Sequence, residues 1–298
     1  MADSTLPQRP PGAARALDEP SRQRPNRRVL GSIGAHGFLI LASVLLAGPF
    51  LWELLTSFKS LTESVAVPPT LLPSSWHLSN YTNVLDAVPF GSELVNSVIN
   101  ALARTAAQLL FCSMAAFAFA WLKFRGRGVV FALFLSVLLV PTQLLVIPQY
   151  QIMQDLHLLN TIPALFLPGM FSAFGTFLLR QFFLSLPPEL HEAARLDGAG
   201  PVRIFWSIML PLARPGLLAL GLLTMIWSWN DLLWPLIVND DPGKMTLSVG
   251  LANLQGVYLT NYPVLMAGAL MATLPLIIVF VVMQRRVVEG IALTGTKG

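Results

Sequence analysis

Long apolar runs alternate with short polar breaks along this chain, and the pattern predicts helices that cross a membrane. About 20 apolar residues, rising 1.5 Å each, cross the roughly 30 Å hydrocarbon layer of a bilayer. We therefore predict an all-α, polytopic membrane protein. Its six spans lie at approximately 30–58, 92–122, 129–151, 161–184, 213–238 and 262–284.

Composition supports the membrane assignment, because 54% of the residues are hydrophobic and only 11% are charged. A typical soluble domain carries about 25% charged residues. The net charge of +4 does not indicate nucleic-acid binding, since the basic residues gather in the polar breaks between spans. Basic residues placed in this way orient a membrane protein.

The orientation follows from which breaks carry the basic residues. If the segment before the first span is cytoplasmic, all but three of the 19 Lys and Arg residues are cytoplasmic, the exceptions being Lys59, Arg104 and Lys244. The opposite orientation violates the positive-inside rule. We expect both termini in the cytoplasm, with a disordered, Pro-rich tail over residues 1–28 and a transmembrane domain over residues 29–298.

A polar island interrupts the apolar pattern at about residues 187–211 and predicts two short helices joined by a turn. Pro187 and Pro188 suit the first turn of a helix, and Gly198 suits a left-handed residue that closes it. Leu190, Ala193 and Ala194 are spaced to lie on one face of the first helix, and such a small-residue face allows another surface to approach closely. The island therefore indicates a docking element, and the alternative is an ordinary amphipathic surface helix.

The same island resembles a motif shared by the membrane subunits of ATP-binding-cassette (ABC) importers. In that motif Glu-Ala-Ala is followed, after three intervening residues, by Gly and then, after nine further intervening residues, by Ile-x-Leu-Pro. This chain keeps every interval. The resemblance implies a type I ABC importer fold in which the first short helix is the coupling helix. The implied ATPase-coupling residues are Glu192, Ala193, Ala194, Asp197, Gly198, Ile208, Leu210 and Pro211.

The resemblance also implies partners. A permease of this family pairs with a homologous second permease, two ATPase subunits and an extracytoplasmic solute-binding protein in the bacterial plasma (inner) membrane. ATP and Mg are bound by the ATPase subunits, so no cofactor is implied for this chain.

Further residues resemble the carbohydrate-uptake branch of the family. The external loop that begins at Lys59 follows a Ser-Phe-Lys end of the first span and carries a Trp and an Asn-Tyr pair. These matching residues are Ser57, Phe58, Trp76, Asn80 and Tyr81, with Asn96 and Ser97 at the head of the second span. Trp76 suits contact with an extracytoplasmic partner, and it equally suits an interfacial anchor.

Polar residues within the spans are candidates for the translocation path. Arg104 is costly in a bilayer, so it should face protein or water. It could line a polar cavity, pair with a carboxylate or form a structural hydrogen bond to a neighbouring helix. The cluster around Trp229 could line a sugar path or form an aromatic belt with interhelical hydrogen bonds. The candidates are Arg104, Gln108, Gln143, Trp229, Asn230 and Asp231.

Catalytic and metal sites are not predicted. The sequence has no Gly-x-x-x-x-Gly-Lys-[Ser/Thr] loop for phosphate, so ATP hydrolysis would reside in other subunits. The four histidines show no metal spacing, and the single cysteine, Cys112, suits a packed core. The leading hypothesis is a sugar importer permease. The alternatives are a secondary transporter driven by an ion gradient, and an ABC importer of another solute such as a glycerophosphodiester.

Overall fold

The computed structural model describes residues 26–256 and 260–295, and every regular element in these ranges is a helix, as predicted. The chain divides into two units, residues 1–50 and 51–298. Helix α1 (Asn26–Ser57) crosses that boundary. The predicted tail lies almost entirely outside the described residues, but α1 begins at Asn26, slightly earlier than the expected start of the transmembrane domain.

Three helices are long and apolar enough to cross a membrane, namely α1, α4 (Phe90–Trp121) and α15 (Tyr262–Gly295). They match the predicted first, second and sixth spans. If each bent helix pair is counted as one span, the structure contains up to six.

The predicted third and fourth spans are broken. Helices α5 (Arg127–Ser136) and η1 (Val137–Leu139) meet η2 (Thr142–Leu145) and α6 (Val146–Asp155) at 97°, with Pro141 in the break. Proline cannot donate the backbone hydrogen bond that a continuous helix needs.

The fourth span bends by 50° between α7–η3 (Ile162–Phe166, Leu167–Gly169) and α8 (Ala173–Leu184). Ser172 caps the second half, since its hydroxyl accepts a hydrogen bond from the Gly175 N–H.

The predicted fifth span is also interrupted. Helix α12 (Arg214–Trp229) has 16 residues, about 24 Å at 1.5 Å per residue. The chain breaks at residues 230–232 and resumes as α13 (Leu233–Val238). Asp231 lies in this break, so its side chain is placed by an interruption in the helix rather than by a helix face.

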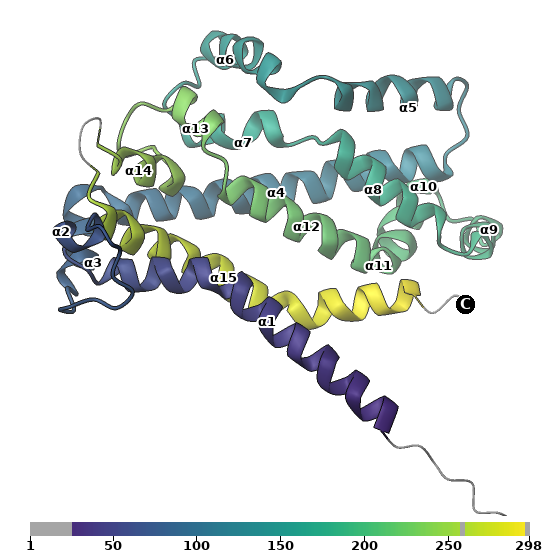
Figure 1. Cartoon of the computed structure of the whole chain (residues 1–298). Coiled ribbons are helices and arrows are strands. Elements are labelled where there is room, and N and C mark those ends of the chain that lie inside the picture. Colours follow the sequence, from purple (N-terminus) through teal and green to yellow (C-terminus); the bar gives the residue numbers. More distant parts are fainter. Residues whose placement is uncertain (1–25, 257–259, 296–298) are drawn as a thin grey trace, which may run out of the picture. The chain divides into compact units, whose positions relative to one another are not determined.

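Short helices form the remaining connections. They are α2 (Leu61–Ser64), α3 (Ser79–Ala87), α9 (Pro188–Leu196), α10 (Pro201–Ile204), η4 (Phe205–Met209), α11 (Leu210–Leu212) and α14 (Leu247–Asn253). Within the second unit, α4 packs against α8 and α12, and it is the element around which the others assemble (Figure 1).

The polar residues that resemble the carbohydrate branch hold the connections in place. Asn80 Nδ2 donates to the Ser57 and Lys59 carbonyls at 2.8 and 2.9 Å. Asn96 Nδ2 donates to the Gly243 and Met245 carbonyls, and the Ser97 hydroxyl accepts from the N–H of Leu247 in α14. These residues therefore act first as structural ties between the loops and the span ends.

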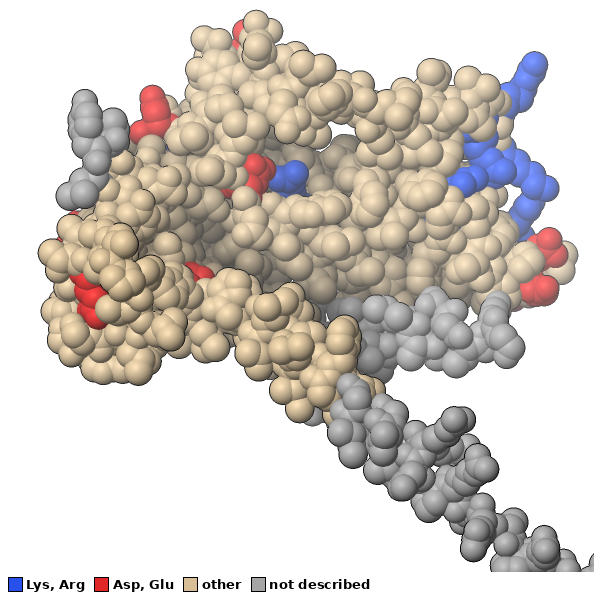
Figure 2. Space-filling model, in the orientation of Figure 1, with Lys and Arg blue, Asp and Glu red and all other residues tan. Residues whose placement is uncertain are grey.

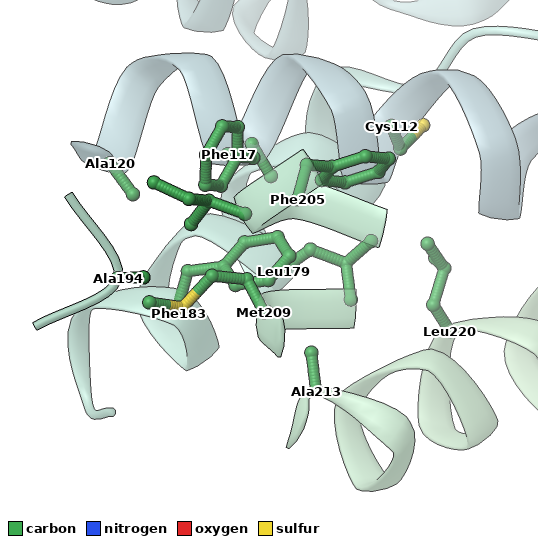
Figure 3. Packing of buried hydrophobic residues seen from close by; sticks show 12 residues of the cluster. Cys112, Phe117, Ala120, Leu179, Phe183, Ala194, Phe205, Met209, Ala213 and Leu220 are labelled. Carbon is green, nitrogen blue, oxygen red and sulfur yellow. The ribbon is translucent and has the colours of Figure 1, made fainter. Parts of the chain in front are cut away.

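A buried cluster joins α4 and α8 to the polar island (Figure 3). Phe117 of α4 and Phe183 of α8 are packed with Phe205 and Met209 of η4 and with Ala194 of α9. Cys112 lies at one end of the same cluster and is fully buried, as expected of a small core residue. Burial of this apolar surface is what attaches the island to the membrane helices.

Candidate functional site: the coupling helix and a charged cavity

Helix α9 is defined at both ends by the residues that the sequence suggested. It begins at Pro188, after Pro187. At its other end Gly198 has φ +79°, while the N–H groups of Ala199 and Gly198 donate to the carbonyls of Ala194 and Arg195. This pair of bonds is a Schellman cap, which requires a left-handed residue.

The two faces of α9 have different surroundings. His191 and Ala194 are buried, each about 7% exposed, and Ala194 packs in the cluster of Figure 3. Glu192, Ala193, Asp197 and Gly198 are exposed. The exposed face also carries Leu196, which is 89% exposed. The expectation that Leu190, Ala193 and Ala194 share one face is therefore wrong. Ala194 packs against the membrane helices of this chain, whereas Leu190, Ala193 and Glu192 are exposed.

The second half of the motif is mainly structural in this chain. Ile208 and Leu210 are half-buried against the Figure 3 cluster, and Pro211 is exposed one turn before α12. The segment η4 is a short π-helix, and α10–α11 meet α12 at 76°. A bent and tightly packed connection therefore joins α9 to α12.

Arg104 and Asp231 form a side-chain ion pair, with Nη1 3.1 Å from Oδ2. Arg104 lies near the middle of α4, and the two side chains are 22% and 24% exposed. The second carboxylate oxygen of Asp231 accepts a 3.4 Å hydrogen bond from the Trp234 N–H. Both charges are therefore paired, which reduces the cost of placing them within the spans.

A polar network continues from this pair through the broken helices. Gln108, one turn along α4, donates to the Gly169 carbonyl at 2.7 Å and accepts from the Thr224 hydroxyl at 2.8 Å. Gly169 is needed here, because a Cβ atom at that position would collide with the Arg104 guanidinium. The network links α4, α12 and the breaks in the fourth and fifth spans.

The ion pair lines a cavity of about 240 Å³. Arg104 of α4 contributes to the wall together with polar and apolar residues in and beside the breaks of three spans: Thr142, Leu145, Val146, Gln149, Leu165, Pro168, Gly169, Asp231, Leu233 and Trp234. In Figure 2 a basic and an acidic patch meet in a hollow on the otherwise uncharged middle of the second unit. Arg104 thus both lines a polar cavity and bonds to a neighbouring segment.

The structure does not bring the other path candidates to this cavity. Gln143 is exposed, with its amide oxygen near the Thr142 hydroxyl. Trp229 is a core residue, 7% exposed, whose Nε1–H donates to the Ala272 carbonyl of α15. Together with Asn230 it lines a separate cavity of about 230 Å³. Asn230 is exposed and bonds back to the Ile226 carbonyl.

Four cavity residues come from the proline-interrupted third span, and two of them, Thr142 and Gln149, are polar. Sequence patterns gave no reason to prefer them to Gln143, since the direction of a side chain beside a break depends on the bend angle. Trp234 of α13 also lines the cavity, and its indole is held in place by an Nε1–H bond to the Ala164 carbonyl at 2.9 Å.

No metal site is evident in the described part of the chain, where no three His, Cys, Asp or Glu side chains converge. The two sites that the structure defines are the exposed face of α9 and the charged cavity. A short helix with one exposed face, joined to broken spans that surround a polar cavity, is the architecture expected of a membrane permease.

Comparison with solved structures agrees. The fold matches a chain of a bacterial ABC transporter involved in the import of the acidic polysaccharide alginate, with a TM-score of 0.75 and 27% identity, over 87% of this chain and 96% of that one. The fold is that of an ABC importer permease.

Residues 108–292 match the family model of the binding-protein-dependent transport system inner membrane component. The chain belongs to this family and is a multi-pass inner membrane protein. It is a transport permease rather than an enzyme, and a secondary transporter driven by an ion gradient is set aside.

Similar proteins include the arabinooligosaccharides transport system permease protein AraQ of Halalkalibacterium halodurans, 37% identical over 93% of this chain and all of that protein. The diacetylchitobiose uptake system permease protein NgcG of Streptomyces coelicolor is 36% identical over 87% of this chain and 86% of that protein. The sn-glycerol-3-phosphate transport system permease protein UgpE of Yersinia enterocolitica is 34% identical over 89% of this chain and 97% of that protein.

Proposed function

We propose that this chain is one half of the transmembrane pathway of an ATP-driven importer that moves a sugar or sugar derivative into the cytoplasm. It pairs with a homologous second permease, two ATPase subunits, which bind ATP and Mg, and an extracytoplasmic solute-binding protein. The observation that carries the proposal is the division of α9 into a buried face, with His191 and Ala194, and an exposed face, with Glu192, Ala193 and Leu196.

The division of α9 supports a mechanical role. An ATPase subunit that binds the exposed face pulls on a helix whose buried face is packed against α4 and α8. Packed interfaces shift between discrete arrangements rather than deforming smoothly, so motion of α9 changes how the spans pack. Nucleotide binding shifts the equilibrium between these packing arrangements only as far as the ATPase subunit binds one arrangement more tightly than the other.

The basic residues near α9 support a cytoplasmic location for it. Lys123 and Arg125 are exposed after α4, and Arg127 donates to the Ala120 and Leu122 carbonyls at the end of that helix. Basic side chains gather at this end of the second unit (Figure 2). With this end inside, the positive-inside rule is satisfied and both termini are cytoplasmic.

The names of the relatives support a carbohydrate cargo. AraQ and NgcG belong to systems for uncharged oligosaccharides, whereas UgpE and the alginate transporter serve charged cargo. Sequence similarity therefore favours a sugar or a sugar derivative for this chain, and it leaves the charge of the cargo open.

The test is uptake by sealed vesicles that contain the complete complex. Uptake of the labelled cargo should require internal ATP, the ATPase subunits and the binding protein. It should also stop when the exposed face of α9 is made bulky and charged by Ala193→Glu, although the chain still inserts. Uptake at the normal rate without the ATPase subunits would overturn the proposal.

A further inference from the structure

The charged cavity contains one positive and one negative side chain, so its net charge is zero. Arg104 and Asp231 are the two charged residues in its wall, and they neutralise each other at 3.1 Å. The remaining polar groups, the Thr142 hydroxyl and the Gln149 amide, are uncharged. A solute in this cavity therefore meets strong hydrogen-bonding groups without a surplus of either sign.

The pair has hydrogen-bonding capacity beyond its mutual bond. Nη1 of the guanidinium is bonded to Asp231 and Nε is buried against Gly169, which leaves the N–H donors of Nη2 for a solute. The Asp231 carboxylate accepts from Nη1 and from the Trp234 N–H, and its two oxygens offer about four lone-pair sites. Adjacent donor and acceptor groups of this kind can bind neighbouring hydroxyl groups.

The rest of the wall suits the apolar side of a sugar ring. Trp234, Leu165 and Leu233 supply apolar surface beside the ion pair, and the bond of Trp234 to Ala164 fixes the indole. At about 240 Å³, the cavity is smaller than the roughly 300 to 1,000 Å³ of drug-sized sites. Its size therefore matches about one sugar unit.

We propose that this cavity is a solute-binding site of the translocation path that accepts an uncharged sugar unit and rejects its anionic counterpart. The inference rests on the function proposed above and narrows its cargo. Asp231 is the residue that sets the preference. An anionic cargo would bind an unpaired Arg104, but here its charge would lie beside the Asp231 carboxylate, and like charges at close range repel.

The experiment uses the complete complex in lipid nanodiscs without the binding protein, so that only the membrane site is measured. The probes are three pairs of sugars that differ in one carboxylate: glucose and glucuronate, galactose and galacturonate, mannose and mannuronate. Saturation-transfer NMR at pH 7 detects weak binding of each. At least one neutral member should bind about tenfold more tightly than its acid, equivalent to about 1.4 kcal/mol.

Asp231→Asn tests the cause of the preference, because it removes the negative charge with little change in shape. The variant should bind the acid at least as well as the neutral sugar. The double variant Arg104→Gln with Asp231→Asn restores neutrality and should again prefer the neutral sugar. Asp240→Asn is the matched control, since Asp240 is exposed in a loop outside the cavity, and it should not change the ratio.

Thr142→Val is a second test of the site, for use if the complexes that carry the charge variants fail to assemble. It removes one hydroxyl from the wall without touching the ion pair, and should weaken neutral binding about threefold or more. The site assignment is overturned if no neutral sugar binds, if the acids bind equally well, or if Asp231→Asn leaves the ratio unchanged. The proposed function has its own test, which is ATP-dependent uptake by the wild-type complex with the binding protein. A failure of the site assignment is therefore distinguishable from a failure of the proposed function.

Discussion

The imidazole of His191 stacks on the indole of Trp121, with ring centroids 4.9 Å apart and planes 20° from parallel. His191 belongs to the buried face of α9, and Trp121 is the last residue of α4. Phe117, one turn earlier in α4, lies 6.4 Å from the same imidazole. This stack is a direct contact between the proposed coupling helix and the central span.

Loss of the stack should weaken coupling. An aromatic pair contributes about 0.5 to 1.5 kcal/mol beyond its buried area, so we expect His191→Ala to lower ATP-driven uptake several-fold while the chain still inserts. His191→Phe keeps a stacking ring and should retain most of the uptake. Glu189→Ala, at an exposed position of the same helix, is the control. Equal uptake by His191→Ala and the wild type would contradict the role of the stack.

The docking of α9 should also depend on pH. Burial, followed by the nearby Arg195 charge, lowers the pKa of His191 from its ordinary value of 6.5, although Glu192 acts in the opposite direction. The released helix therefore binds a proton at a higher pH than the docked helix does. Docking stability is fully present above pH 6.5 and is lost as the pH falls through that value toward the lowered pKa of the docked ring.

Protease sensitivity of the α9 region, measured between pH 7.5 and 5, should rise as the pH falls. The His191→Phe variant lacks the titrating group and should show a smaller rise. An unchanged pH profile in that variant would assign the effect to another group.

Gly198 and Gly200 allow a matched test of the helix cap. A Cβ atom added at either position would meet no atom within 4 Å, so alanine causes no collision at either one. Gly198 has φ +79°, whereas Gly200 has φ −70°. A left-handed conformation costs a non-glycine residue about 1 to 2 kcal/mol. We therefore expect Gly198→Ala to lower both thermal stability and ATP-driven uptake, and Gly200→Ala to change neither appreciably.

Replacing each of the two alanines of the motif by a larger residue should have different effects on stability and on ATPase binding. Ala194 is buried in the Figure 3 cluster, and overpacking a core typically costs about 1 to 3 kcal/mol. Ala194→Leu should therefore lower the melting temperature of the isolated permease. Ala193 is exposed, so Ala193→Leu should leave that temperature unchanged and instead reduce copurification with the ATPase subunits. Equal effects on both measurements would mean that the two faces of α9 are not distinct.

The sequence predicted most of what depends on local chemistry. Apolar runs of sufficient length revealed the spans, and Pro188 and Gly198 fixed the ends of α9 because their backbone preferences act within one turn. The contact between Arg104 and Asp231 was harder to predict, since 127 positions separate them. Sequence could show only that each needed a partner.

The roles of neighbouring residues in the fifth span depended on tertiary packing. Trp229, Asn230 and Asp231 are consecutive, yet they point to α15, to the preceding turn of α12 and to the cavity, respectively. The helix break at residues 230–232 sends the three side chains in different directions. Periodicity assumes a regular helix, so it could not separate the core residue from the cavity residue.

Gly169 offers a test of the cavity that leaves both charges in place. A Cβ atom at this position would collide with the Arg104 guanidinium, so Gly169→Ala must displace either Arg104 or the backbone whose carbonyl accepts from Gln108. We expect a clear loss of thermal stability, about 1 to 3 kcal/mol, together with reduced ATP-driven uptake. Gly128→Ala is the matched control, because a Cβ atom there meets nothing within 4 Å. If Gly169→Ala were as stable and as active as that control, the close packing of Arg104 on the broken fourth span would not be needed for transport.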